Sequence, residues 1–172
     1  GMGAISGEDG AAVLKEIGAL AASLNVVRDD WNGFNIVHKA AGRVAGLDLG
    51  FTPVGEALDA RAMLSGGVDL LFLLGADEFD ASQLGATSVV YIGSHGDKGA
   101  SVADIVLPGA AYTEKSGIYT NLEGRVQISE RAVFPKGEAK EDWAILRALS
   151  AHLGATLPYD SLTQLRNKLI TD

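Results

Sequence analysis

Three nearly continuous apolar runs stand out in the pattern of hydrophobic and polar positions along the chain. They cover residues 68–74, 88–92 and 104–107, so their starts lie 20 and 16 residues apart. Strands that are apolar at nearly every position are typical of a parallel sheet buried on both faces. The spacing leaves room only for short crossover helices. The pattern therefore predicts an α/β fold of Rossmann type with an open, mostly parallel sheet.

A helical pattern precedes these runs. Ser6 is a predicted helix cap and Asn25 a predicted stop, and apolar residues recur between them at helical spacing at Val13, Ile17, Leu20 and Leu24. A second helix is predicted to begin after Asn32 or Asn35 and to end at Gly46.

Shorter elements are expected on either side of the sheet. A short strand over residues 47–51 and a short helix over residues 57–64 should lead into the first apolar run. After the third run, residues 117–129 predict an irregular β hairpin with its turn at residues 122–124. Two C-terminal helices follow, one over residues 143–153 and a short one after Ser161.

One α/β domain over residues 6–172 fits this sequence of elements, since 172 residues is an ordinary length for one domain. Gly1 before Met2 is typical of a residue left by tag cleavage, so we expect residues 1–5 to be a disordered start. Such a start is also consistent with a domain that is part of a longer subunit.

Composition removes several classes of function. The chain has 14 Lys+Arg against 22 Asp+Glu, and its net charge of -8 argues against nucleic acid and against docking on anionic lipid. The sequence contains no cysteine, which excludes disulfides, thiolate metal ligands and a cysteine nucleophile. No apolar run reaches the length of a membrane span, about 18 residues, so we expect no direct membrane insertion.

The loop Gly75-Ala76-Asp77-Glu78-Phe79-Asp80 follows the first predicted strand, where open α/β sheets bind ligands. Its acids could hold a hard cation such as Mg²⁺. We favour the alternative, in which Asp80 caps a short helix over residues 81–84 while Asp77 and Glu78 are solvated. A phosphate group would be repelled by these three carboxylates.

The loop Gly93-Ser94-His95-Gly96-Asp97-Lys98-Gly99 follows the second predicted strand. Its spacing, G-x-x-G-x-x-G, matches neither the dinucleotide fingerprint nor the P-loop, so plain turn chemistry is favoured over nucleotide binding by this loop alone. Ser94, His95 and Asp97 are near neighbours in sequence, and such residues seldom converge as a hydrolytic triad. The three histidines, His38, His95 and His152, lie too far apart in sequence for a local metal-binding motif. We therefore expect no catalytic residue and no metal ligand.

Glu114, Glu123 and Arg125 form a last group of charged residues. Gly124 permits a tight turn between the last two. We expect Arg125 to pair with a nearby carboxylate and fix the loop, and we prefer this role over substrate binding.

Residues 103–127 carry a more specific signal. Residues 103–108, A-D-I-V-L-P, resemble the A-D-V-V-L-P signature of molybdopterin-dependent oxidoreductases, and residues 114–127, E-K-S-G-I-Y-T-N-L-E-G-R-V-Q, resemble the block E-x-x-G-T-x-x-N-x-E-G-R-x-Q that follows it. The resemblance assigns structural roles within these motifs to Asp104, Pro108, Glu114, Gly117, Asn121, Glu123, Gly124 and Arg125.

One branch of that superfamily fits the rest of the chain better than the others. The stretches at residues 31–38, 40–44, 47–51 and 71–80 resemble the large iron–sulfur subunit of NADH-quinone oxidoreductases, respiratory complex I. That resemblance implies a region that keeps the molybdopterin-enzyme fold without its cofactor. It further implies an intact subunit with 2Fe–2S and 4Fe–4S clusters elsewhere. The implied partners are the rest of the subunit and other hydrophilic-arm subunits, at the cytoplasmic face of a bacterial inner membrane.

Departures from the cofactor-binding relatives point the same way. Those enzymes often have G-x-N-P where this chain has Gly75-Ala76-Asp77-Glu78, and hydroxyl-rich T-x-T-A where it has Lys98-Gly99-Ala100-Ser101. The resemblance therefore implies a non-catalytic scaffold with a vestigial site at Gly75, Asp77, Gly93, His95 and Gly96. Two alternatives stay open: a fragment of a genuine molybdopterin-dependent oxidoreductase that contributes to the pterin-dinucleotide site, and a free-standing nucleotide-binding module.

Overall fold

The structure, a computed structural model, describes residues 1–171 and divides into two compact units. Unit 1 joins Gly1–Thr52 with Ile118–Ser129, and unit 2 joins Pro53–Gly117 with the chain from Glu130 onward. Each unit is described by itself. Whether they fold as the one domain expected from the sequence stays a prediction.

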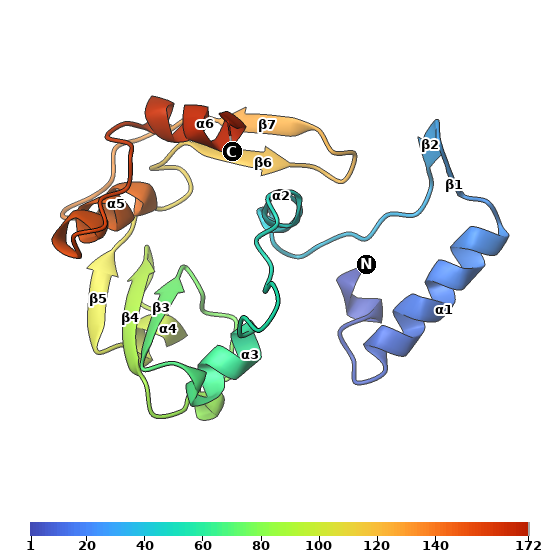
Figure 1. The fold of residues 1–172 in the computed structure, drawn as a ribbon, viewed down its shortest axis with the longest axis horizontal. Coiled ribbons are helices and arrows are strands. Elements are labelled where there is room, and N and C mark those ends of the chain that lie inside the picture. The colour runs from blue at the N-terminus through green and yellow to red at the C-terminus, as the bar shows by residue number, and fades with distance from the viewer. Residues whose placement is uncertain (172) are drawn as a thin grey trace. The chain divides into compact units, whose positions relative to one another are not determined.

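A three-stranded parallel sheet lies at the centre of unit 2, as the apolar runs predicted. Its strands are β3 (Leu70–Leu74), β4 (Ser88–Gly93) and β5 (Ile105–Pro108), in the order β3-β4-β5. In the register, Phe72 lies beside Val90, and Val90 lies beside Ile105. Figure 1 shows the three arrows side by side and pointing the same way. The α/β class with a mostly parallel sheet is confirmed.

Short connections link these strands, as expected. Helix α3 (Ala60–Ala62) runs into a wider helical turn at Met63–Gly67, where Gly66 has a φ of 92° and ends the helix. A single 3-10 turn (Ala81–Gln83) joins β3 to β4, and α4 (Lys98–Val102), which packs against β4, joins β4 to β5.

One face of the sheet forms the core. Leu71, Leu73, Val89 and Tyr91 are buried on it, and partly buried apolar residues pack against them: Met63, Leu64, Val68, Phe79, Leu84, Ala100, Val102 and Ala103. The expectation of burial on both faces holds only for β4. In β3 the side chains alternate between buried and exposed, with Leu70, Phe72 and Leu74 left open to solvent. Continuous apolarity therefore overestimated how far the outer strands are buried.

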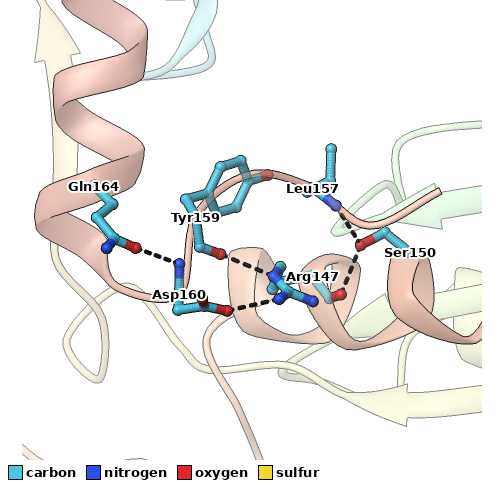
Figure 2. Close-up of polar contacts among 6 residues, drawn as sticks. All are labelled: Arg147, Ser150, Leu157, Tyr159, Asp160 and Gln164. Atoms are coloured by element: carbon cyan, nitrogen blue, oxygen red, sulfur yellow. Dashed lines mark hydrogen bonds and ion pairs between the residues drawn. The ribbon is translucent and has the colours of Figure 1, made fainter.

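The C-terminal helices α5 (Asp142–His152) and α6 (Leu162–Thr171) match the sequence prediction, and Gly154 follows α5 with a φ of 73°. Figure 2 shows how the chain between them is held. Arg147 donates to the Tyr159 carbonyl at 2.9 Å and to Asp160 at 2.6 Å, while the Ser150 hydroxyl accepts from the Leu157 N–H at 3.0 Å. The loop is therefore tied to α5 through side chains on one stretch of that helix.

Unit 1 contains α1 (Gly10–Ser23), the two-residue strands β1 (Val27–Arg28) and β2 (Trp31–Asn32), and α2 (Arg43–Asp48). It also holds the paired strands β6 (Gly117–Thr120) and β7 (Val126–Ser129), apart from Gly117 itself. Strands β6 and β7 confirm the predicted hairpin. No helix among residues 1–171 has the length and apolarity needed to cross a membrane.

One prediction for the start of unit 1 is wrong. Ser6 does not cap α1, because its hydroxyl donates to the Met2 carbonyl at 2.5 Å and the helix begins only after Asp9. The error arises from a contact that helical periodicity does not encode. Before it, Met2–Ala4 form a 3-10 turn, and the Met2 N–H donates to the Val37 carbonyl at 3.1 Å. The division into a start over residues 1–5 and a domain from residue 6 stays a prediction.

The second predicted helix begins later than expected, and the strand over residues 47–51 does not form. Helix α2 starts at Arg43, runs through Gly46 and ends at Asp48, and Gly50 then turns the chain with a φ of 67°. Helix α2 has six residues and no side-chain cap, so the sequence offers no local signal for its bounds.

Candidate functional site

The two loops that follow β3 and β4 meet through one carboxylate, that of Asp77. Its Oδ1 accepts from the backbone N–H of Gly99 at 2.7 Å, and its Oδ2 accepts from the hydroxyl of Tyr91 at 2.8 Å. The Tyr91 hydroxyl also lies 3.2 Å from the His95 carbonyl. Hydrogen bonds to an ionised acceptor are among the stronger ones in proteins. Asp77 therefore braces the carboxyl edge of the sheet, where α/β folds bind ligands.

Tyr91 is the buried residue at the centre of these hydrogen bonds. Its side chain is 1% exposed, and its ring leaves no room for a side chain at two neighbouring glycines. A Cβ at Gly93 would lie 2.2 Å from the Tyr91 hydroxyl, and one at Gly99 would lie 2.5 Å from the ring. Burial, followed by the hydrogen bond from Tyr91 to Asp77, raises the pKa of Tyr91 to about 12. Tyr91 therefore stays a neutral hydrogen-bond donor at any ordinary pH.

The first loop agrees only in part with the sequence prediction. Asp80 caps the Ala81–Gln83 turn, as expected, by accepting from the Ser82 N–H at 3.0 Å and the Ser82 hydroxyl at 2.8 Å. These hydrogen bonds, with a smaller contribution from Lys98, hold the pKa of Asp80 below its usual value. Glu78 is exposed, but Asp77 is not the solvated acid that was expected. Its partners lie 14 and 22 residues away, beyond the reach of loop patterns.

The other residues of the expected vestigial site have backbone roles. Gly75 turns the chain with a φ of 57° and donates its N–H to the Ile92 carbonyl at 2.7 Å. Gly93 lies beside Pro108 in the sheet, and a side chain at Gly96 would meet nothing within 4 Å. His95 is exposed, and its Nδ1 lies 2.9 Å from the Ser94 hydroxyl. In the described chain, Asp97 forms no hydrogen bond with Ser94 or His95, so these three residues do not form a hydrolytic triad.

The first family motif fastens β5 to its neighbours. Asp104 accepts from the Val89 N–H at 2.8 Å and donates its own N–H to the Val89 carbonyl at 2.9 Å, which fixes the start of β5. Pro108 ends the strand, and its carbonyl accepts from the Lys140 N–H at 3.1 Å. Glu114, the first residue of the second motif, is 9% exposed and accepts from the Ala111 N–H at 3.0 Å, so it closes the turn that follows β5.

The second motif is built around Asn121. Its Oδ1 accepts from the N–H groups of Glu123 and Arg125, both at 2.9 Å, and Gly124 supplies the positive φ of 77° that the turn requires. Gly117 begins β6. The predicted pair between Arg125 and a carboxylate is absent from residues 1–171, and the side chains of Glu123 and Arg125 are exposed. The backbone of the turn uses Asn121 and Gly124, and nothing in the structure explains the two charged side chains.

The sequence did not predict two of the contacts near this edge. The apolar pattern predicts Tyr91 only as part of a strand, but a phenol in a buried run also signals that its hydroxyl needs a partner. Lys115 forms an ion pair with Asp142, the first residue of α5, and the two side chains are 30% and 25% exposed. That pair joins residues 27 apart.

The arrangement suits structural support better than the binding of a phosphate-bearing cofactor. The Gly99 N–H, which a phosphate oxygen could use, already donates to Asp77, and Glu78 and Asp80 add negative charge nearby. Within residues 1–171 no group of three or more His, Asp or Glu side chains is placed to hold a metal ion. The Asp77 carboxylate therefore already uses a backbone donor that a phosphate-bearing cofactor would need.

The sequence of this chain matches a known protein family and several curated proteins. A family model described as molybdopterin oxidoreductase matches residues 1–152. An NADH-quinone oxidoreductase subunit of Rickettsia bellii is 47% identical over 170 residues, a match that covers 98% of this chain and 24% of that protein. The mitochondrial NADH-ubiquinone oxidoreductase 78 kDa subunit of Candida albicans is 46% identical over 172 residues, with 98% and 23% covered.

The chain thus spans about a quarter of the length of these curated relatives. Among solved structures, acetylene hydratase from Pelobacter acetylenicus has a TM-score of 0.45 and 28% identity, and it covers 55% of this chain and 15% of that one. At that score the likeness carries no argument.

Proposed function

The chain belongs to the molybdopterin oxidoreductase family, and on that basis we propose that it is a non-catalytic scaffold region of the large iron–sulfur subunit of an NADH-quinone oxidoreductase. One observation carries this proposal: identity of 46 to 47% over 98% of the chain to proteins named as subunits of such enzymes. The family name alone suggests a redox enzyme, and the structure of the sheet edge argues for the scaffold instead.

The sheet edge supports a role without a cofactor. A molybdopterin dinucleotide carries phosphates, and phosphates need free N–H donors and a positive field. At this edge the Asp77 carboxylate already accepts from the Gly99 N–H and from the Tyr91 hydroxyl. An anion would have to displace a covalently tethered anion, so the chain's own side chain competes with any phosphate ligand.

In the proposed assembly, electrons pass from NADH to quinone through redox centres that other regions carry. The intact subunit would hold 2Fe–2S and 4Fe–4S clusters, and this region, without a cysteine, would hold none of their thiolate ligands. Its partners would be the rest of the same subunit and other hydrophilic-arm subunits. The complex would hold it peripherally at the cytoplasmic face of a bacterial inner membrane.

Analysis of the purified chain tests the scaffold role directly. We expect no stoichiometric iron or molybdenum by elemental analysis, no flavin absorbance, and no NADH oxidation with quinone or ferricyanide. Stoichiometric metal or measurable turnover by the chain alone would overturn the scaffold proposal. Titration calorimetry with ATP, GTP and NADH should give no heat of binding, and a saturating signal would favour a nucleotide-binding module.

A fragment of a genuine molybdopterin oxidoreductase is the second candidate, and the matching family model favours it. The complete parent protein separates the two. Molybdenum or tungsten at one atom per chain, together with pterin fluorescence after oxidative release, would establish this candidate. Iron and acid-labile sulfide without molybdenum, tungsten or pterin would establish the iron–sulfur subunit.

A further inference from the structure

The loop that leads into α5, residues 130–141, borders a hollow on the surface of unit 2. The hollow has a volume of about 320 Å³, and all its lining residues belong to that unit. They are Arg131, Phe134, Pro135, Gly137, Ala139, Lys140, Glu141, Trp143 and Ala144. Two of them carry large aromatic rings. A hollow at the lower end of the size range of ligand sites suits one large side chain.

The loop is held at both ends by backbone hydrogen bonds. At its start the N–H groups of Ala132 and Val133 donate to the Thr113 carbonyl, at 2.9 and 3.2 Å. At its end the Lys140 N–H donates to the Pro108 carbonyl at 3.1 Å. A surface that is already ordered loses less conformational entropy when a partner binds. The hollow is therefore pre-formed in the chain alone.

Charged contacts hold the two aromatic walls. The Arg131 guanidinium lies 4.5 Å from the centre of the Phe134 ring, and its Nη1 lies 3.4 Å from the Glu141 carboxylate. Glu141 also accepts from the Trp143 indole N–H at 2.9 Å. Phe134 nevertheless stays 78% exposed. An exposed aromatic ring beside an arginine is the composition typical of residues that dominate binding energy in protein interfaces.

The loop is basic, although the protein as a whole is acidic. Residues 131–140 hold three basic residues and one acid, which are Arg131, Lys136, Lys140 and Glu138. Their net charge of +2 contrasts with -8 for the chain. Within residues 1–171, Lys136 and Lys140 form no ion pair, and both are exposed. The acids that follow are already used, because Glu141 pairs with Arg131 and Asp142 pairs with Lys115.

We propose that this hollow receives an aromatic side chain from an acidic segment of a separate protein chain, with the carboxylates of that segment facing Lys136 and Lys140. A third ring would pack against Phe134 and Trp143. Nucleic acid or an anionic membrane would meet the net charge of -8, which a short acidic segment largely avoids. Complementary charge speeds the encounter of separate molecules, whereas segments of one polypeptide meet without it. That the separate chain is another subunit of the same assembly rests on the proposed function.

Nuclear magnetic resonance titration of the purified, ¹⁵N-labelled chain tests the surface. The probe is the peptide acetyl-Glu-Asp-Glu-Trp-Glu-Asp-Glu-amide. We expect saturating shifts confined to the amides of residues 130–144, with a Kd of about 100 μM that weakens about tenfold between low salt and about 0.5 M NaCl. Replacing Trp by Ala should weaken binding about tenfold, and replacing every acid by Lys should abolish it. No saturation, equal binding of the Lys peptide, or shifts centred elsewhere would overturn the proposal.

Charge-reversed variants separate the local charge from the charge of the whole chain. Lys136→Glu with Lys140→Glu should weaken peptide binding about tenfold or more. The matched control is Lys15→Glu with Lys39→Glu, two exposed lysines of unit 1, which changes the net charge equally and should alter the Kd by less than about twofold. Phe134→Ala should also weaken binding, and circular dichroism checks that each variant is folded. Equal weakening by the two charge-reversed variants would show a response to net charge alone and overturn the proposal.

A photo-cross-link in the complete parent assembly identifies the partner. p-Benzoylphenylalanine is placed at position 134, with the same amino acid at position 51, where Phe51 is 90% exposed in unit 1, as a comparison. Position 134 should join the subunit to a different polypeptide at an acidic segment, and position 51 should not give this product. A cross-link within the subunit, to a second copy, or to a segment without acids would overturn the proposal, as would no cross-link. The proposed function is judged by the metal content of the parent, so either can fail alone.

Discussion

Both units of the chain contain many large apolar side chains, but only unit 2 builds a buried core from them. In unit 2, Val89, Tyr91 and Ile92 are each 1% exposed. In unit 1 the single buried apolar residue among those described is Ala21, while Leu24 is 63% and Phe51 is 90% exposed. The difference follows from how each unit closes on itself. Strands β3 to β5 pair with their sequence neighbours, whereas α1 and α2 need a surface to pack on.

This contrast indicates that unit 2 contributes more to the stability of the chain than unit 1. Short helices are marginal unless an apolar stripe is buried against a partner, and the stripe of α1 is mostly exposed. A parallel sheet with one complete face provides its own partner. Substitutions of similar chemistry should therefore cost much more in unit 2 than in unit 1.

The largest expected effect comes from truncating the centre of the sheet. Ile92→Ala removes a fully buried side chain and should lower the free energy of unfolding by about 3–4 kcal/mol. The matched change in unit 1, Leu24→Ala, affects a side chain that is 63% exposed and should cost under about 1 kcal/mol. Urea denaturation followed by circular dichroism measures both. Equal losses at the two sites would show that unit 1 is packed as tightly as unit 2.

The next largest effect is a pH dependence that arises from Tyr91 in unit 2. The pKa of Tyr91 is about 12 when folded, against about 10 when unfolded. A raised folded pKa stabilises the fold fully below pH 10, and this contribution is lost as the pH rises from about 10 to about 12. The loss amounts to about 2–3 kcal/mol.

Tyr91→Phe isolates this contribution from other groups that titrate at high pH. The difference in unfolding free energy between wild type and Tyr91→Phe should be constant up to about pH 9 and shrink above pH 10. In Asp77→Asn, spectrophotometric titration should show the pKa of Tyr91 falling toward 10 yet remaining above it, because burial is the larger cause of its elevation. An unchanged Tyr91 pKa in Asp77→Asn would show that the Tyr91–Asp77 hydrogen bond does not form.

Glycine substitutions then probe how tightly the sheet edge is packed. Gly99→Ala places a Cβ 2.5 Å from the Tyr91 ring and 2.9 Å from the Asp77 carboxylate, so one of them must shift. We expect a loss of about 2 kcal/mol. Gly96→Ala lies three residues earlier in open space and should be nearly neutral. Thermal unfolding of the two variants measures the difference, and a neutral Gly99→Ala would mean that the edge is loose.

The same contrast explains what the sequence could and could not predict. The three strands of unit 2 were found because each is a continuous apolar run, and α5 and α6 because Gly154 and Ser161 mark their bounds. The start of α1 and the bounds of α2 were wrong. Ser6 donates to the Met2 carbonyl instead of capping α1, and α2 has no side-chain cap, so neither boundary is marked by a capping residue.

At the candidate site the sequence located both loops but not the contact that joins them. Asp80 was correctly interpreted as a cap because its partner, Ser82, is two residues away. The sequence predicts a solvated Asp77, because Tyr91 and Gly99 approach this carboxylate only once β3 and β4 are paired. Local hydrogen bonds were therefore predictable, whereas those across the sheet edge required the fold.

The smallest expected effect lies in the hairpin of unit 1. It distinguishes Asn121, which holds the backbone of the turn, from the exposed side chain of Arg125. Asn121→Ala removes the acceptor of two backbone N–H groups and should cost about 1 kcal/mol. Arg125→Ala removes an exposed side chain and should change the unfolding free energy by under about 0.5 kcal/mol. Both are measured by chemical denaturation of the purified chain. A loss above about 1 kcal/mol for Arg125→Ala would restore the ion pair that the sequence predicted, since an exposed side chain without a partner has no contact to lose.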